Sequence, residues 1–324
     1  NTEVLNEQIR YNAEFINGMS YRVTIRVCTD GEMTYTDRFI RIKNASYLVV
    51  VINIGTDMLG IEKELDLYKI PENIDFKSVD DWNKVCGEHT NLFSSYMQRV
   101  CLKIDADEFV GPTDKRLAAF KNGSADENLF ALYLNYGRYL LLSSSICGRL
   151  PANLQGKWNG DIEPAWHSDY HFDINIQMNY WLAENGNLGE TTNAMFDYID
   201  LFKESGEAAA KKVYDCRGIL LPLSSDCWGI SSQESYGWDI WIGAAAWIAQ
   251  HYYKHYEYKG DKEFLKNRAY PYLKSVIEFY EDYLIRDENG VYQIIPSVSP
   301  ENSFLENKDI NISLGISSAM DVQL

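Results

Sequence analysis

Aromatic rings, carboxylates and side-chain amides crowd into residues 150–184, which read LPANLQGKWNGDIEPAWHSDYHFDINIQMNYWLAE. The segment holds three tryptophans, two histidines and six amides, with four carboxylates ahead of Ala183. A sugar ring offers apolar C–H faces that stack on flat rings, and hydroxyls that need positioned donors and acceptors. The mixture therefore indicates a carbohydrate site, although an aromatic content of 14% also fits dense core packing.

Three residues of this segment, His171, Asp173 and Asn175, alternate and would share one face of an extended chain. The carbonyl oxygen of Asn175 can orient a water molecule without adding charge, unless the residue only forms a turn. Asp173 can act as a base or orient that water, or its carboxylate can be satisfied by backbone amides in a loop. We expect His171 to bind a sugar hydroxyl; the alternative is a hydrogen-bonded core histidine.

Glu301 lies far along the chain in the loop Pro296–Asn302, which reads PSVSPEN. Cleavage of a glycosidic bond needs a carboxylic acid that keeps its proton near neutral pH and donates it to the leaving oxygen. Pro296 and Pro300 restrict the backbone of the loop that would carry such an acid. Residue type alone favours a solvated loop glutamate over this acid role.

Seven further polar or aromatic residues are candidates for contacting the sugar. They are Gln155, Trp158, Asn159, Trp166, Asp226, Trp228 and Asn302. Trp158 or Trp166 could stack on a sugar face, although core packing is the more common role of a single tryptophan. Met178, Tyr180 and Trp181 are assigned to the buried side of a short helix.

The composition is that of a globular protein of 324 residues, which is long enough for two domains. Hydrophobic residues make up 46% and charged residues 24%. The net charge of −17 argues against a nucleic-acid partner or an anionic membrane surface, because both carry negative charge. No apolar run approaches the ~20 residues that span a bilayer, so membrane insertion is not expected. The six cysteines show no metal-ligand spacing and are interpreted as buried free thiols.

Alternating apolar residues predict strands near the N-terminus. Tyr21–Val27, Met33–Ile42 and Tyr47–Ile54 read as part of a β-sandwich, and Gln98–Ile104 as one more strand. Because three strands seldom form a stable domain, partner strands upstream are expected. After Asp126 helices are expected at 126–145, 177–184, 190–202, 207–214, 239–258 and 261–285, with a break at Ser205 and Gly206. This order is typical of a toroid of helical hairpins.

Six segments, in their order and spacing, resemble glycoside hydrolase family 95, the inverting α-L-fucosidases. They are GPTDKRL, YGRYLLLSSS, LPANLQGKWN, DYHFDINIQMNYWLAE, YKGDKEFLKNRAYPYLK and PSVSPENSF. The resemblance implies a mainly α fold, an (α/α)6 helical toroid that is incomplete in this chain and is preceded by part of a β-sandwich domain. The implied boundaries are 1–60 for the C-terminal part of the β-sandwich, 61–113 for a linker region and 114–324 for the N-terminal portion of the barrel.

The resemblance also implies exo-hydrolysis of terminal α-1,2-linked fucose with inversion, and some members of the family prefer α-L-galactose. The expected partner is a fucosylated oligosaccharide or another plant or host glycan, and no metal or organic cofactor is expected. Glu301 matches the general acid of the family. His171 and Asn175 match a family pattern, H-x-N-x-N, whose asparagines hold the attacking water while a more C-terminal aspartate completes the base.

Two stretches depart from the family pattern. Asp173 stands where the pattern has asparagine, and in GILLPLSSDCWG the residues Pro222 and Leu223 replace a histidine pair, while Asp226 and Trp228 match. These departures favour altered sugar recognition. They also keep open a second interpretation, a catalytically impaired carbohydrate-binding relative or an inactive fragment. Half a ring alone would expose its inner face, so a missing barrel half or self-association that completes the ring is expected.

Overall fold

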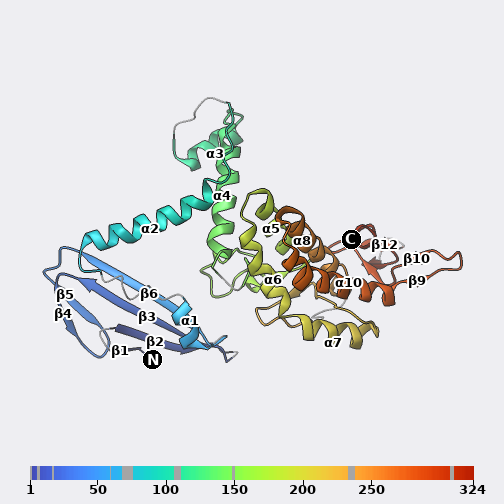
Figure 1. Ribbon diagram of the computed structural model, residues 1–324, viewed down its shortest axis with the longest axis horizontal. Helices are drawn as coiled ribbons and strands as arrows, with labels where there is room; N and C mark the ends of the chain where they lie inside the picture. The colour runs from blue at the N-terminus through green and yellow to red at the C-terminus, as the bar shows by residue number, and fades with distance from the viewer. Residues whose placement is uncertain are drawn as a thin grey trace. The chain divides into compact units, whose positions relative to one another are not determined.

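The computed structural model describes residues 2–5, 8–16, 18–58, 60–67, 76–105, 111–147, 150–232, 238–306 and 310–324 (Figure 1). The chain divides into two compact units, Asn1–Ser95 and Tyr96–Leu324. The first unit is built on strands and the second on helices. The linker predicted at 61–113 includes residues 68–75 and 106–110, which lie outside the described residues, and its boundaries at 60 and 113 stay predictions.

A four-stranded antiparallel sheet forms the first unit, in the order β1-β2-β3-β6. Its strands are β1 (Thr2–Leu5), β2 (Gln8–Glu14), β3 (Ser20–Thr29) and β6 (Leu48–Thr56), and β4 (Glu32–Tyr35) and β5 (Ile40–Lys43) form a hairpin between β3 and β6. The strands predicted at 21–27 and 47–54 are confirmed, while the run at 33–42 is split in two. The sequence prediction does not include β1 and β2.

One face of this sheet is aliphatic. The register of β3 and β6 places Ile25 opposite Ile52, and the pairs two positions away on either side are also aliphatic. Along β6 this face is open to solvent, since four side chains are 48–60% exposed: Leu48, Val50, Ile52 and Ile54. The other face packs against α1 (Ile61–Leu67). Gly55 allows this approach, because a Cβ atom there would lie 3.0 Å from the carbonyl oxygen of Ile61.

The second unit is a succession of helices joined by loops and short ladders. Its longer helices are α4 (Asn128–Ser145), α5 (Asn175–Asn185), α6 (Thr192–Asp200), α7 (Lys203–Tyr214), α8 (Ala244–Lys259) and α10 (Tyr270–Tyr283), and α2 (Val79–Met97) ends inside it. Shorter ones are α3 (Thr113–Lys121), α9 (Lys262–Phe264), α11 (Ala319–Gln323) and the 3-10 turns η1 (Ala165–Ser168), η2 (Gly189–Thr191) and η3 (Trp238–Ile240). A π-turn, η4 (Leu265–Ala269), joins α9 to α10. Among the described residues no helix is both long and apolar enough to cross a membrane.

Four small antiparallel ladders connect these helices. They are β7 (Tyr170–His171) with β8 (Ser224–Ser225), β9 (Ile285–Arg286) with β10 (Tyr292–Gln293), β11 (Ser297–Val298) with β14 (Leu314–Gly315), and β12 (Phe304–Glu306) with β13 (Ile310–Ile312). Each of the six helices predicted after Asp126 has a counterpart in approximately the predicted place, although 261–285 is divided into α9, η4 and α10 and α3 was not predicted. All six cysteine thiols are free, but only Cys216 is buried, so the prediction of buried thiols holds for that residue alone.

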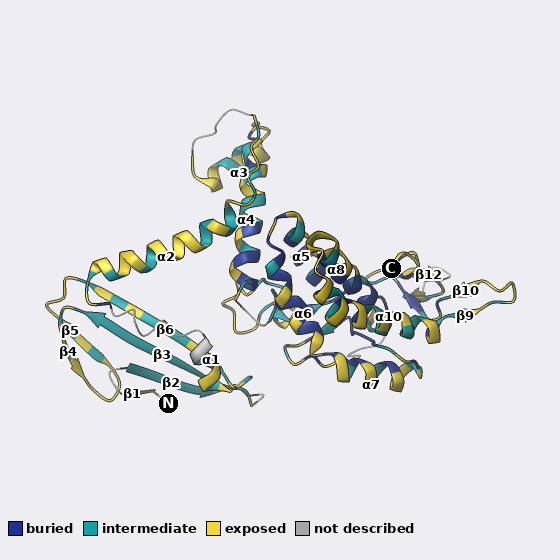
Figure 2. Ribbon diagram, viewed as in Figure 1, coloured by how far each residue is buried: buried dark blue, intermediate teal, exposed yellow. Residues whose placement is uncertain are grey.

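The core of the second unit lies among α5, α6, α8 and α10, where Figure 2 shows many of the buried residues. Aromatic rings fill it: the ring centroids of Phe196 and Tyr252 lie 4.3 Å apart, and those of Tyr252 and Tyr272 lie 4.5 Å apart. The alanines at 244–246 are buried and let α8 pack closely against its neighbours α5 and α10.

The helix break expected at Ser205 and Gly206 is wrong. α6 ends at Asp200, and α7 begins at Lys203 and runs through the glycine. Gly206 serves close packing instead, because a Cβ atom there would lie 2.6 Å from a side-chain carbon of Ile219. A glycine in a helix costs about 1 kcal/mol relative to alanine, and here the close contact with the following loop requires it.

The strand expected at Gln98–Ile104 is also wrong, since none of these residues is in a strand. A fully buried side chain, Arg138 on α4, contacts the end of α2 and the start of this segment. Its guanidinium donates to the carbonyl oxygens of Tyr96, Met97 and Val100 at 3.0, 2.7 and 3.3 Å. Of these, Val100 lies in the predicted strand, and its carbonyl is therefore used by a side chain rather than by a neighbouring strand.

Candidate active site

A two-residue ladder brings together the two sequence segments that carry most of the predicted site residues. β7 pairs with β8, so that His171 lies opposite Ser224. The ladder continues with a hydrogen bond of 2.7 Å from the backbone amide of Phe172 to the carbonyl oxygen of Leu223. Residues 150–184 and 218–229 therefore meet at His171.

The chain leaves the strand directly after His171. Asp173 lies in a turn, and Asn175 is the first residue of α5. Gln177 holds this turn, because its buried side-chain amide donates a hydrogen bond of 2.6 Å to the carbonyl oxygen of Phe172. The expectation that the three alternating residues lie on one face of an extended chain is therefore wrong beyond His171.

Four titratable side chains form an electrostatic cluster, which we call the acid cluster: His171, Asp173, Asp239 and Glu301. They come from β7, the turn after it, η3 and the loop after β11. Burial disfavours the charged form of His171, but an ion pair with Asp169 and the charges of Asp173 and Glu301 outweigh burial and raise its pKa. Glu301 is thus close enough to influence groups that lie far from it in the sequence.

Asp173 lies at the centre of the electrostatic interactions of the acid cluster. Burial raises its pKa; its own backbone amide and His171 oppose the shift, while the charges of Glu301 and Asp239 add to it. One oxygen, Oδ1, is buried and has no hydrogen-bond partner among the described residues. A carboxylate of raised pKa with a free acceptor atom can take a proton from a bound water molecule. Backbone amides satisfy only part of this carboxylate.

The loop that carries Glu301 is anchored on both sides. Before it, the hydroxyl of Ser297 in β11 donates a hydrogen bond of 2.5 Å to the carboxylate of Asp321. After it, Asn302 donates to Ser299 twice, from its backbone amide at 2.7 Å and from its side-chain amide to the hydroxyl oxygen at 3.2 Å. Glu301 itself is exposed, so its carboxyl group is accessible to a ligand.

The candidate tryptophans lie at the surface rather than in the core. Trp158, Trp166 and Trp228 are 57%, 66% and 45% exposed. The ring of Trp158 stacks on Tyr139 of α4, with centroids 6.4 Å apart and planes 24° apart. Trp166 has a left-handed backbone, with φ of 48°. Exposed rings held in this way can offer a face to a sugar.

The other polar candidates have local partners. The side-chain amide of Gln155 donates 2.9 Å to a backbone carbonyl, while its Oε1 is buried without a partner among the described residues. Oδ1 of Asn159 and Oδ1 of Asp226 each accept from the backbone amide two residues on, at 2.6 and 2.7 Å. These hydrogen bonds fix the loops in shape. The sugar contacts assigned to these residues, to Asn175 and to Asn302 stay predictions.

The side of α5 that is buried differs from the side that the sequence predicts. Tyr180 is buried, at 1% exposed, but Met178 and Trp181 are 52% and 50% exposed. Ile176 and Ala183 share the buried side with Tyr180. The assignment of Met178 and Trp181 to packing is therefore wrong: the buried side follows the helical spacing of Ile176, Tyr180 and Ala183, and Met178 and Trp181 lie off it.

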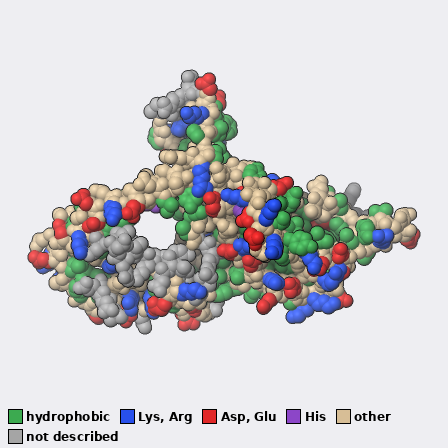
Figure 3. All heavy atoms as spheres, in the orientation of Figure 1, with side chains coloured by type: hydrophobic (Ala, Val, Ile, Leu, Met, Phe, Trp, Pro, Cys, Tyr) green, Lys and Arg blue, Asp and Glu red, His purple; other side chains and the backbone are tan. Residues whose placement is uncertain are grey.

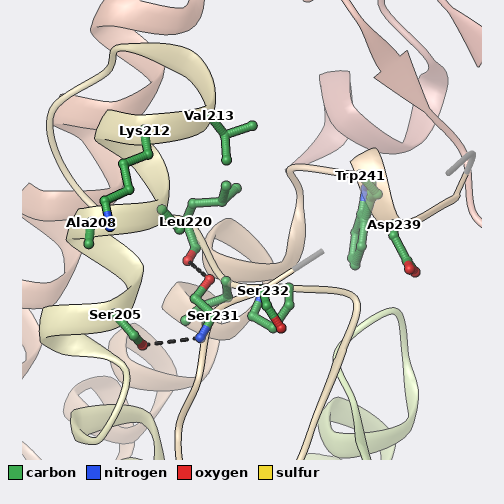
Figure 4. Close-up of a pocket in the computed structure, with 12 residues that line it drawn as sticks. Ser205, Ala208, Lys212, Val213, Leu220, Ser231, Ser232, Asp239 and Trp241 are labelled. Carbon is green, nitrogen blue, oxygen red and sulfur yellow. Dashed lines mark hydrogen bonds between the residues drawn. The ribbon is translucent and has the colours of Figure 1, made fainter. Parts of the chain in front are cut away.

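A cavity of about 320 Å³ adjoins the acid cluster through Asp239 (Figure 4). Lys212 and other residues of α7 line one side, and Trp241 lies across from them. Ser231 secures the wall, since its amide donates 3.1 Å to the hydroxyl of Ser205 and its hydroxyl donates 2.6 Å to the carbonyl of Leu220. None of the site residues predicted from the sequence lines this cavity.

The surface charges of this unit are mixed. Figure 3 shows basic and acidic side chains interspersed over the region of α6 to α10 on the face that it presents. Within the described ranges, no group of three or more His, Cys, Asp or Glu side chains is arranged to hold a metal ion.

Comparison with known proteins defines the class of the helical part. The family model described as "Glycosyl hydrolase family 95 catalytic domain" matches residues 81–324, so this part is a glycosyl hydrolase catalytic domain. The chain belongs to glycosyl hydrolase family 95. The family membership that the six sequence segments imply is confirmed.

Two curated relatives are named as fucosidases. "Alpha-L-fucosidase 2" of Arabidopsis thaliana is 39% identical over 214 residues, which cover 65% of this chain and 25% of the relative. "Probable alpha-fucosidase A" of Aspergillus niger is 32% identical over 197 residues, which cover 59% of this chain and 25% of the relative. The matched part spans about a quarter of the length of these relatives.

A solved structure shares the fold. The structure titled "Putative kojibiose phosphorylase from human microbiome" matches with a TM-score of 0.54 at 10% identity, over 93% of this chain and 38% of that chain. At this identity the likeness concerns the fold alone. The predicted fold class is confirmed: the chain is mainly α and holds part of an (α/α)6 helical toroid, preceded by β-sheet.

Two carboxylates near His171 are missing from the predicted site. Asp169 lies two residues before His171 and contacts its ring. Asp239 influences Asp173 from a different part of the chain. The alternation of residues 169, 171 and 173 is a signal that would have included Asp169, whereas no local pattern points to Asp239.

Proposed function

We propose that the protein is an inverting exo-glycosidase that removes terminal α-L-fucosyl residues, or the closely similar α-L-galactosyl residues, from glycans. The observation that carries the proposal is the electrostatic proximity of Glu301 to His171 and Asp173. A glycosidase needs an acid and a base that flank one glycosidic bond, and these groups come together from separate loops. The names of the curated relatives support a fucoside as substrate.

The proposed roles follow from the chemistry of each group. Glu301 donates its proton to the glycosidic oxygen as the bond from that oxygen to the anomeric carbon breaks. A water molecule oriented by the carbonyl oxygen of Asn175 forms the new bond from the opposite face, which inverts the anomeric centre. Asp173 either accepts the proton of that water or orients the water for a carboxylate elsewhere in the protein.

Recognition of the sugar is the part that departs most from the family. Pro222 and Leu223, at the places of a family histidine pair, are buried and apolar. They supply no hydrogen-bond donors to a sugar hydroxyl. Fucose and galactose of the L series differ by one hydroxyl group, so a change of this kind can shift the preference between them.

A carbohydrate-binding relative without hydrolytic activity is the second candidate. It is favoured by Asp173, which places a carboxylate where the family pattern has a neutral amide. Such a group adds negative charge beside Glu301 and Asp239. It can change the position or the proton of the attacking water.

The test is an assay of the full-length protein on 2′-fucosyllactose and on aryl α-L-fucoside and α-L-galactoside. We expect Glu301→Gln to lower kcat/KM by about 100-fold or more, because the acid is lost. Glu288→Gln, an exposed loop glutamate, is the matched control and should retain full activity. Proton NMR of the first product should show the β-anomer.

Each other outcome has a definite meaning. Hydrolysis that survives Glu301→Gln unchanged contradicts the acid role. An α-anomer formed first contradicts inversion. Binding of these sugars without turnover of any of them favours the second candidate.

A further inference from the structure

Asp169 and His171 form an ion pair beside the acid cluster. Oδ1 of Asp169 lies 2.8 Å from Nε2 of His171, and the two side chains are only 23% and 17% exposed. The histidine backbone is fixed by its pairing with Ser224 in β8. Because the backbone of His171 is fixed, its ring can move only by rotation about its own side-chain bonds.

An unusual backbone presents Asp169 to the ring. Trp166, His167 and Ser168 are three successive non-glycine residues in the left-handed region, with φ of 48°, 56° and 53°. Residues other than glycine seldom adopt this conformation, and they keep it only where the surroundings hold them. Here the amide of Asp169 donates 3.2 Å to the carbonyl of Trp166, and its carbonyl accepts from Leu154 at 3.0 Å.

Three charged side chains face His171: Asp169, Asp173 and Glu301. On the adjacent strand, Ser224 and Leu223 carry no charge. Among the described residues, Asp169 is the one ion-pair partner of His171, so the other two carboxylates act on the ring without fixing its orientation. The nitrogen that Asp169 occupies is Nε2, and the second ring nitrogen is Nδ1.

We propose that Asp169 is a positioning residue of this site: it binds Nε2 of His171, fixes the ring and leaves Nδ1 to meet a hydroxyl of the sugar. The inference rests on the proposed function, because it takes the ligand of Nδ1 to be a sugar. The orientation of a histidine is generally set by the partner of its other nitrogen. Asp169 acts through His171 and does not itself touch the substrate.

The first measurement reports on the ring rather than on catalysis. The full-length protein is labelled with ¹⁵N-histidine, and His171→Gln identifies the signals of His171. We expect the neutral ring to carry its proton on Nε2, and added L-fucose or L-galactose to shift the Nδ1 signal. Asp169→Asn should move the titration of His171 to lower pH, because the carboxylate that favours the cation is gone.

The second measurement is kinetic. We expect Asp169→Asn to lower kcat/KM by about tenfold to a hundredfold, the size of one lost contact between oppositely charged side chains of limited exposure. In a His171→Ala background the same substitution should change kcat/KM by less than about twofold, because the residue acts only through the ring. Asp282→Asn is the matched control, since Asp282 pairs with Arg217 at 2.8 Å and is 29% exposed.

Several results would overturn the proposal. They are a neutral ring protonated on Nδ1, a titration that does not move in Asp169→Asn, an Nδ1 signal unmoved by either sugar, and losses that multiply in the double variant. If the Asp169 variants do not fold, the proton position and the sugar response of the unmodified protein decide alone. If the protein binds these sugars but hydrolyses no substrate, the proposed hydrolysis fails, while the ring spectra still test the pairing.

Discussion

The indole nitrogen of Trp241 donates a hydrogen bond of 2.9 Å to the carboxylate of Asp321. The second oxygen of that carboxylate accepts from the hydroxyl of Ser297 at 2.5 Å, and all three side chains are at most 4% exposed. Trp241 lies two residues after Asp239, and Ser297 lies four residues before Glu301. One buried carboxylate therefore ties together two of the segments that form the acid cluster.

Removal of this carboxylate should weaken both segments. We expect Asp321→Ala to destabilise the protein by about 2–4 kcal/mol, because two buried donors lose their acceptor. Hydrolysis should fall as well, since Glu301 loses its anchor. Urea unfolding of the full-length protein measures the first effect. Asp114→Ala, an exposed aspartate paired with Lys115, is the control and should change the midpoint little; an Asp321→Ala midpoint equal to that of the parent protein would contradict the argument.

Arg138 offers a second stability test. Its guanidinium donates to three carbonyl oxygens at the end of α2 and to that of Gly186 at 3.1 Å. Replacement by methionine leaves buried carbonyls unpaired and should cost about 3 kcal/mol or more. Lysine, with fewer donors and no planar fork, should recover only part of this. Arg286→Met, at an exposed arginine, is the control, and a similar midpoint shift in both methionine variants would refute the prediction.

We expect Asp173→Asn to raise the stability of the protein at neutral pH, whatever it does to the activity. The pKa of Asp173 in the folded protein is above the ordinary value of 3.8, so the folded state binds more protons than the unfolded state between these two values. Stability therefore falls as pH rises through that window, and it stays lower at neutral pH. The amide removes this effect, and we expect Tm at pH 7 to rise by about 2 °C, with no gain below pH ~3.8.

The same variant tests the base. If Asp173 accepts the proton of the attacking water, kcat should fall by about 100-fold or more. Full activity of Asp173→Asn would assign the base to another carboxylate of the protein.

His171 predicts a pH dependence in the same direction as that of Asp173, in a higher pH window. Its pKa in the folded protein is raised above the ordinary 6.5, so the stability from its ion pair is present below pH 6.5 and is lost as pH rises through the raised value. Asp169→Asn should therefore lower Tm at pH 6 and leave it nearly unchanged at pH 9. Asp282→Asn should lower Tm equally at both values, because Arg217 does not titrate in that range and the pKa of Asp282 is about 2. Equal losses at both values in Asp169→Asn would contradict the prediction.

The exposed tryptophans should matter for binding and not for folding. We expect alanine at Trp158, Trp166 or Trp228 to raise KM by about tenfold, the loss of one stacking contact, with kcat nearly unchanged. Tm should move by less than about 2 °C, because the rings are largely exposed. Trp82→Ala, in the first unit and 48% exposed, is the control for loss of an exposed indole. An unchanged KM in all three variants would remove these rings from the site.

The sequence predicts well those features that depend on neighbours along the chain. α4 follows from an apolar period near 3.6, and the packing of α8 follows from consecutive small residues. β2 carries the same kind of local signal, since Ile9, Tyr11 and Ala13 alternate with polar residues, and it could have been predicted. The order of motifs indicated Glu301 and the segment around His171 as candidates for the site, and their roles stay predictions.

Features that depend on side chains far away in the sequence could not be predicted from local patterns. In Gln98–Ile104 the carbonyl oxygen of Val100 is bound by Arg138, about forty positions later. Whether Gly206 ends a helix is decided by Ile219, and the turn after His171 is decided by Gln177. In each case a tertiary contact overrides a correct local preference.

The open aliphatic face of β6 has a consequence for handling the protein. Leu48, Val50, Ile52 and Ile54 form a continuous aggregation-prone surface, because alternate residues of a strand project to one side. A fragment limited to residues 2–95 would associate through this surface and precipitate at concentrations used for crystallisation. A lysine in place of Ile52, in the middle of this surface, would keep such a fragment monomeric.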